Sequence, residues 1–219
     1  MEIKAPGPTG PLSGTLWGPP DLGAPVVLIV PGSGPTDRDG NSPLGIRAST
    51  YRLVAKGLAA RGIRSVCIDK RGLFGSARAI SDANAVTIQD YAADIRTWAV
   101  TIRQETGAPC VWVLGHSEGG LAALLAAQQP FGLCGLLLVS TAGRPLGAVL
   151  REQIKATFSS APLRERAETI LARLEIGRRS TSEDISPPLL PLFRPEVQSF
   201  LSSVLALDQS WPRPIAARC

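Results

Sequence analysis

Histidine is almost absent from this sequence, whose 219 residues include one, His116. The four cysteines are widely spaced and form no CxxC pair, so no cluster of zinc ligands is present. We therefore expect no metal and no other cofactor. Cys67, Cys110 and Cys134 lie in or beside apolar strand candidates, where cysteine usually acts as a small buried hydrophobe. A reduced, cytoplasmic protein is the expectation.

Long apolar runs and basic runs are also missing. The longest apolar runs, such as residues 136–139, fall far below the roughly 20 residues of a membrane span. The N-terminus has no apolar stretch after a basic start and is not expected to be a secretory signal. The net charge of +5 comes mostly from scattered arginines, without a basic stretch interleaved with aromatics. We expect neither a nucleic-acid nor a membrane partner.

Along the sequence, apolar runs of strand length alternate with helical patterns. Strands are predicted over 26–30, 65–69, 111–114 and 135–140, and helices over 51–61, 87–106 and 117–129. This rhythm predicts an α/β fold, with a mostly parallel sheet and helices on both faces. Residues 12–17 are predicted to form an antiparallel edge strand that leads into it.

The rhythm stops after residue 140. Helical patterns at 150–158, 163–176 and 195–207 follow one another without strands between them, and the proline-rich stretch SPPLLPLFRP separates the last two. Residues 145–207 are therefore interpreted as a helical insertion, or lid.

The segment Gly115-His116-Ser117-Glu118-Gly119 matches GxSxG between an apolar strand and an apolar helix. In a nucleophile elbow the chain turns so tightly that the serine is strained, and glycines two residues before and after it avoid collisions. The pattern predicts Ser117 as a nucleophile exposed at the carboxyl end of the sheet. The alternative is a glycine-rich turn without chemistry.

A second motif, PGSG at residues 31–34, directly follows the first buried strand. Acyl transfer needs two backbone N–H groups directed at the developing oxyanion. We expect one from Glu118, which follows the nucleophile, and the other from Ser33. A simple glycine turn is the alternative for this loop.

Other polar residues near these motifs are interpreted as structural. His116 is not expected to act as the base, because adjacent residues in a sharp turn point in different directions; it is expected to pack under the elbow. The charged segments 37–41 and 69–72 are expected to hold a local ion-pair network rather than to catalyse.

Together, VVLIVPGSGPTDRDGNSP, SVCIDKRGLFGS and VWVLGHSEGG resemble the α/β-hydrolase superfamily, in particular bacterial serine hydrolases related to the S33 peptidase-like group. The resemblance runs from about residue 12 to residue 208. It implies an eight-stranded sheet, commonly with a helical cap after the sixth strand. It also implies Ser117 as nucleophile, Ser33 and Glu118 as oxyanion donors, and an acid and then a histidine after Ser117.

The sequence departs from that family pattern, because no histidine follows His116. The downstream acids lie in or beside the presumed cap: Glu152, Glu165, Glu168, Glu175, Glu183, Asp184, Glu196 and Asp208. We expect an α/β-hydrolase fold that lacks the last strands, with a core (1–144), a cap (145–207) and a tail (208–219). Truncation of a longer hydrolase is favoured over a complete chain that has lost catalysis, because the strained elbow is retained.

The predicted activity of the intact parent is hydrolysis of a small or medium carboxylic ester through an acyl-enzyme. Amide or peptide substrates are the alternative. The chain by itself is expected to be very weak or inactive. The rival hypotheses are a non-catalytic binding module and a hydrolase completed by another polypeptide. The missing strands would expose a sheet edge, which a swapped or paired homodimer would cover.

Overall fold

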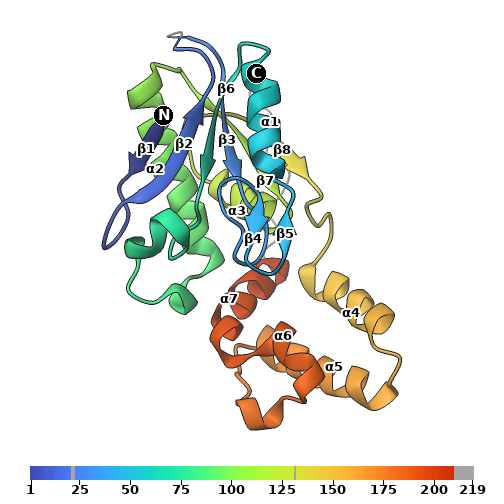
Figure 1. The fold of residues 1–219 in the computed structure, drawn as a ribbon. Coiled ribbons are helices and arrows are strands. Elements are labelled where there is room, and N and C mark those ends of the chain that lie inside the picture. Colours follow the sequence, from blue (N-terminus) through green and yellow to red (C-terminus); the bar gives the residue numbers. More distant parts are fainter. Residues whose placement is uncertain (21–22, 131, 210–219) are drawn as a thin grey trace. The chain divides into compact units, whose positions relative to one another are not determined.

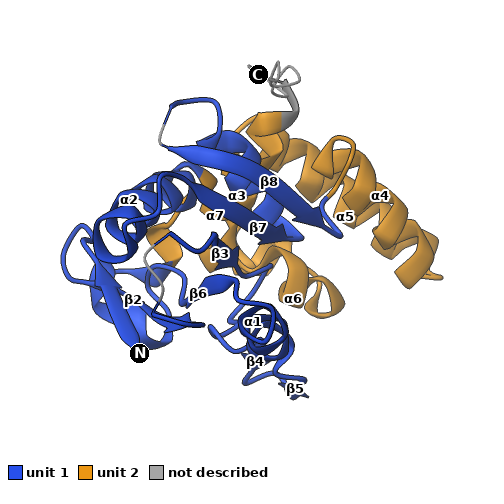
Figure 2. Cartoon of the chain, turned by 90° about the horizontal axis from the view of Figure 1, so that it is seen from above, with its two compact units in different colours: residues 1–83, 89–141, 214–219 blue, residues 84–88, 142–213 orange. Residues whose placement is uncertain are grey.

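The structure is a computed structural model, and it describes residues 1–20, 23–130 and 132–209. The described residues form two compact units (Figure 2). Residues 1–83 and 89–141 belong to the first, and residues 84–88 and 142–209 belong to the second. The sequence placed this division after residue 144 and did not assign 84–88 to the helical part. From residue 210 the predicted tail lies outside the described residues.

The first unit is built on a six-stranded sheet in the order β1-β2-β6-β3-β7-β8 (Figure 1). Its strands are β1 (Glu2–Ala5), β2 (Leu12–Trp17), β3 (Val26–Val30), β6 (Arg64–Ile68), β7 (Val111–His116) and β8 (Leu133–Val139). β6, β3, β7 and β8 pair in parallel, whereas β1 pairs with β2, and β2 with β6, in antiparallel fashion. A separate ribbon pairs β4 (Asn41–Ser42) with β5 (Ile46–Arg47). The prediction of a mostly parallel sheet is confirmed.

Helices cover both faces of this sheet (Figure 2). They are α1 (Thr50–Ala59), α2 (Ile88–Thr106) and α3 (Glu118–Ala126). The 3-10 turn η1 (Phe74–Ala79) belongs to the same unit, whereas most of η2 (Ala83–Ala85) belongs to the second unit. Successive side chains of a strand point to opposite faces, so β3 contributes to both layers. Ile29 packs in one cluster with Tyr51 of α1, while Val30 lines a small cavity with Ile95 and Trp98 of α2.

The N-terminal part of the sheet differs from the prediction. Residues 12–17 form an antiparallel strand as expected, but this strand, β2, is not at the edge because β1 pairs with its outer side. β1 alternates exposed and buried residues, and Ile3 and Ala5 are its buried positions. A strand of four residues is too short for its alternation to stand out in a sequence.

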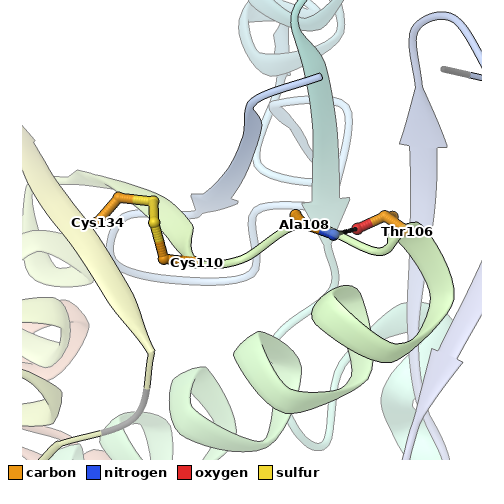
Figure 3. The surroundings of a disulfide bond; sticks show 4 residues. All are labelled: Thr106, Ala108, Cys110 and Cys134. Atoms are coloured by element: carbon orange, nitrogen blue, oxygen red, sulfur yellow. Dashed lines mark hydrogen bonds between the residues drawn. A yellow bond between two sulfur atoms is a disulfide. The ribbon is translucent and has the colours of Figure 1, made fainter. Parts of the chain in front are cut away.

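Two of the cysteines form a disulfide, so the expectation of reduced thiols is wrong for them. Cys110 and Cys134 are joined with a Cα–Cα distance of 5.2 Å (Figure 3). Cys110 directly precedes β7, Cys134 lies in β8, and these parallel strands begin side by side with Val111 opposite Leu133. Cys67 is a free, buried thiol as expected. Burial raises its pKa to about 12, and the charge of Asp39 raises it as well. The predicted cytoplasmic location stays a prediction.

The short connection between α2 and β7, residues 107–110, ends at Cys110 of this disulfide. The Thr106 hydroxyl, in the last turn of α2, accepts a hydrogen bond from the Ala108 amide (Figure 3). It also donates a hydrogen bond to the Ile102 carbonyl. The hydroxyl therefore satisfies one backbone group on each side of the helix end.

Helices and 3-10 turns are the regular elements of the second unit within its described residues. Its elements are α4 (Leu146–Thr157), α5 (Ala161–Glu175), η3 (Ser182–Asp184), η4 (Pro187–Leu189), α6 (Leu190–Phe193), α7 (Pro195–Leu205) and η5 (Ala206–Gln209). The three predicted helices are present, α4 beginning four residues earlier than expected. The proline-rich stretch contains η4 and the short α6.

An apolar cluster and one buried amide hold this helical unit together. The cluster comprises Leu150, Ile154, Ala167, Ile170, Leu171, Leu174, Ile185, Leu189, Phe193 and Leu205. The Gln198 side chain is fully buried and bonds to both backbone groups of Ser180 and to the Phe193 carbonyl. On the surface, Arg151 of α4 pairs with Glu168 and Glu175 of α5.

None of the described helices combines the length and the apolar character needed to cross a lipid bilayer.

In the six-stranded sheet β8 is an edge strand, and its Leu137, Leu138 and Val139 are exposed. Pairing of two copies through this edge stays a prediction.

Candidate functional site

The turn between β7 and α3 has the geometry of a strained elbow. Ser117 lies between the end of the strand and the first residue of the helix, with φ 52° and ψ −116°. Positive φ is uncommon for a residue with a Cβ and costs about 1–3 kcal/mol, so such a residue persists only where its surroundings enforce it. Its amide donates to the Val139 carbonyl of β8 at 2.8 Å. The residue is partly accessible to solvent.

The glycines of this turn stand where no side chain fits. A Cβ on Gly115 would lie 2.5 Å from the Gly120 Cα, and a Cβ on Gly119 would lie 2.5 Å from the Pro31 carbonyl oxygen. A Cβ on Gly120 would collide with the Thr141 side chain. Glycine at position 115 therefore lets the two ends of the elbow approach each other, and glycine at position 119 lets α3 pack against the loop that follows β3.

The loop after β3 carries the two residues Gly32 and Ser33 beside the elbow. Within the described residues the Ser33 amide donates no hydrogen bond. Glu118 is the first residue of α3, so its amide has no helical carbonyl four residues back. Two unused backbone donors thus lie among the described residues, one in the elbow and one in the loop that packs against it. Such donors suit a developing negative charge.

Gly32 is held by hydrogen bonds on both of its backbone groups. Its amide donates to the Tyr51 hydroxyl at 3.0 Å, and its carbonyl accepts from the Lys70 ammonium at 2.6 Å. Lys70 also binds the Glu118 carboxylate at 3.0 Å and lies 5.2 Å from the centre of the Tyr91 ring. The Lys70 side chain is 5% exposed.

His116 lies behind the loop. Its Nδ1 is 2.8 Å from the Tyr51 hydroxyl oxygen, and a Cβ on Gly32 would lie 2.9 Å from the same nitrogen. Burial raises the pKa of Tyr51 above its usual value of 10, and the Glu118 carboxylate raises it further. The phenol therefore keeps its proton at neutral pH.

The turn Asp69-Lys70-Arg71 connects three segments through ion pairs. Asp69 binds Arg38 of the charged loop at 2.5 Å, and Arg71 binds Asp94 of α2 at 2.6 Å and Asp90 at 2.9 Å. Burial raises the pKa of Asp94 although Arg71 opposes that shift. The expected ion-pair network between the segments 37–41 and 69–72 is confirmed by the Arg38–Asp69 pair.

Several of the acids downstream of Ser117 have structural contacts in the helical unit. Glu152 pairs with Arg144, and Asp184 caps η3 through the Thr181 amide and hydroxyl. Across the described ranges, no group of three or more His, Cys, Asp or Glu residues could hold a metal ion.

Two residues beside the site had no predicted role, Tyr51 and Lys70. Tyr51 was expected only as the first residue of a helix, and Lys70 only as part of a charged turn. The contacts of Tyr51 with Gly32 and His116 span 19 and 65 residues. A local sequence pattern contains no signal of such a contact.

The sequence matches a known protein family. The family described as serine aminopeptidase, S33 matches residues 44–186, well over half of the chain. No curated protein matches the sequence.

Several solved structures share the fold. An α/β-hydrolase described among novel epoxide hydrolases from metagenomes of hot environments is 19% identical, with a TM-score of 0.54 over 94% of this chain and 70% of that one. A thermophilic esterase from Thermogutta terrifontis is 18% identical, with a TM-score of 0.51 over 94% and 72%. The α/β-hydrolase GrgF from Penicillium sp. sh18 is 20% identical, with a TM-score of 0.55 over 93% and 72%.

The chain spans only part of the length of these structures. It covers 65% of a putative α/β-hydrolase from Agrobacterium tumefaciens that it matches with a TM-score of 0.50. These likenesses, all at 20% identity or below, establish the α/β-hydrolase fold alone.

Proposed function

The chain belongs to the serine aminopeptidase, S33 family of the α/β-hydrolase superfamily, and from this membership we propose that it is a serine hydrolase of carboxylic esters with Ser117 as nucleophile. The observation that carries the proposal is the conformation of Ser117, φ 52° and ψ −116°, at the junction of β7 and α3. A strained serine at this junction presents its hydroxyl at the carboxyl end of a parallel sheet.

The proposed reaction is acyl transfer in two steps. The Ser117 oxygen attacks the ester carbonyl carbon, and the Ser33 and Glu118 amides stabilise the oxyanion. The alcohol leaves as the acyl-enzyme forms, and water then releases the acid. Gly115, His116 and Gly119 serve the elbow structurally. Amide or peptide bonds are the alternative substrates.

In this proposal, the described residues supply no base for the reaction. The one histidine has its Nδ1 bonded to Tyr51, and the described acids of the helical unit lie in that unit's own ion pairs and caps or on its surface. We propose that the chain by itself is a very weak catalyst, and that an acid and a histidine come from residues beyond it or from another polypeptide. The alternative function is a non-catalytic binding module.

Chemical rescue tests this proposal directly. A fluorophosphonate probe should label Ser117 slowly in the isolated chain, and imidazole in solution should accelerate labelling because it can act as an external base. Ser117→Ala is the control, with labelling located by mass spectrometry of the peptide. A probe that never modifies Ser117, with or without imidazole, supports the binding module instead. Rapid labelling without imidazole contradicts the claim that no base is present.

A further inference from the structure

Lys70 contacts both segments that provide the proposed oxyanion donors. Its ammonium binds the carbonyl oxygen of Gly32 at 2.6 Å and the carboxylate of Glu118 at 3.0 Å. In a trans peptide the C=O and the following N–H point in opposite directions within one plane. Holding the Gly32 oxygen therefore fixes the direction of the Ser33 N–H.

The charge of Lys70 has a second effect at the same place. Glu118 brings a carboxylate, 13% exposed, to the residue whose amide is the other proposed donor. A negative charge there opposes the formation of an oxyanion, and the Lys70 ammonium compensates it. Charge interactions of this kind are strong because both groups are largely shielded from water.

The position of the ammonium is itself fixed from several sides. Lys70 follows the end of β6, its side chain is 5% exposed, and it lies over the Tyr91 ring. On the other side of Gly32, Tyr51 binds the amide, so the glycine cannot rotate either of its peptide groups without losing a hydrogen bond.

We propose that Lys70 is a positioning residue of the oxyanion hole, directing the Ser33 amide through the Gly32 carbonyl and neutralising Glu118. This inference rests on the proposed function of Ser117. It assigns to Lys70 no contact with substrate and no proton transfer.

Two organophosphates with the same leaving group provide the test, paraoxon with a P=O group and parathion with a P=S group. In either reaction the Ser117 oxygen forms a bond to phosphorus, the bond to p-nitrophenolate breaks, and the serine proton passes to solvent. Oxygen accepts hydrogen bonds from the two amides much better than sulfur does. The ratio of the two rates in one variant, relative to the wild type, therefore reports on the oxyanion donors.

The variants are Lys70→Met, Lys70→Arg, Glu118→Gln and the double variant Lys70→Met/Glu118→Gln in the full chain. Removing one oxyanion donor costs about 10²–10³-fold, so misdirecting one should lower the paraoxon rate by roughly 10–100-fold. The parathion rate should change much less. Lys70→Arg should restore part of the paraoxon-to-parathion rate ratio. The double variant should recover the part of the loss that comes from the unpaired Glu118 charge, but not the part that comes from the misdirected Ser33 amide.

Arg64→Met is the matched control. Arg64 is a second buried cation at the opposite end of β6, and it bonds the Ala24 and Thr106 carbonyls. Its removal should leave the rate ratio unchanged. Circular dichroism and thermal melting check that each variant folds, and the double variant avoids an unpaired carboxylate if Lys70→Met alone unfolds.

The outcomes separate the two proposals. If Ser117 is phosphorylated and Lys70→Met leaves the paraoxon-to-parathion rate ratio unchanged, the role of Lys70 is overturned and the nucleophile stands. This includes an equal loss of rate with both reagents. Phosphorylation no faster than in Ser117→Ala overturns the proposed function, and the role of Lys70 with it.

Discussion

The Tyr51 phenol oxygen and the His116 Nδ1 atom lie 2.8 Å apart. The same hydroxyl accepts the Gly32 amide, so Tyr51 links His116 to the loop after β3. The histidine nearest the nucleophile in sequence thus supports the loop after β3.

The first prediction concerns this histidine. His116→Asn replaces the imidazole with a side-chain amide that can still form a hydrogen bond with the Tyr51 hydroxyl. We expect the rate of fluorophosphonate labelling at Ser117 to change by less than about tenfold, since loss of a catalytic histidine costs about 10⁶-fold in kcat. A loss near that size would identify His116 as the base. Mass spectrometry of the Ser117 peptide over time measures the rate.

The second prediction concerns the close packing of the elbow. Gly119→Ala places a Cβ 2.5 Å from the Pro31 carbonyl oxygen and 2.6 Å from that of Val30. The backbone must shift, so we expect a loss of about 1–3 kcal/mol in the free energy of unfolding. Gly57→Ala in α1 is the control, because the added Cβ meets nothing within 4 Å apart from its own helix backbone; it should stabilise by about 0.5–1 kcal/mol. Urea denaturation of both variants checks the difference, and a neutral Gly119→Ala would contradict the described elbow.

The third prediction concerns the Cys110–Cys134 disulfide. Alkylation of the unfolded, unreduced protein should modify Cys67 but neither Cys110 nor Cys134, and native Cys67 should resist the reagent because it is buried with its pKa raised to about 12. The bond spans 24 residues, so the double variant Cys110→Ala/Cys134→Ala should lose up to about 3 kcal/mol of stability. Peptide mapping that finds alkylated Cys110 without prior reduction would refute the bond.

The fourth prediction concerns pH. The two hydrogen bonds from Arg151 lower the pKa of Glu175 below its usual 4.5, although partial burial opposes them. A lowered folded-state pKa contributes stability above the unfolded value of 4.5, and this contribution disappears as the pH falls through the folded value. Glu175→Gln should therefore cost about 0.5 kcal/mol at neutral pH and nothing in strong acid, a small effect because the pair is exposed to water.

Urea unfolding of the wild type and of Glu175→Gln, from neutral pH to strong acid, measures the difference in their free energies of unfolding. Glu165→Gln is the control on the same helix, α5, because among the described residues no ion pair joins its carboxylate. A difference for Glu175→Gln that persists in acid would show that the hydrogen bonds do not depend on its charge.

Features encoded in adjacent residues were predictable from the sequence. The elbow around Ser117 follows from the succession of an apolar strand, GHSEGG and an apolar helix, and the glycines stand where the contacts require them. The parallel sheet follows from the alternation of elements. β1 was missed because four residues give too little alternation to recognise.

Features that depend on register or on distant packing were not predictable. The disulfide requires that β7 and β8 begin side by side, which fixes Cys110 near Cys134, and no pattern in either strand encodes this register. The hydrogen bonds from Tyr51 and Lys70 to Gly32 arise when three separate segments meet. Their residue types are common at helix starts and in charged turns, so the sequence alone gave them no distinct role.

Asp69, Lys70 and Arg71 leave the end of β6 in succession, and each binds a different part of the first unit. These residues form a turn after the strand, so one inserted or deleted residue there would displace their side chains from their partners. All the pairs would be lost in a single event, and several charges would be stranded in the interior. The number of residues in this turn is consequently a stricter requirement of the fold than the identity of any one of them.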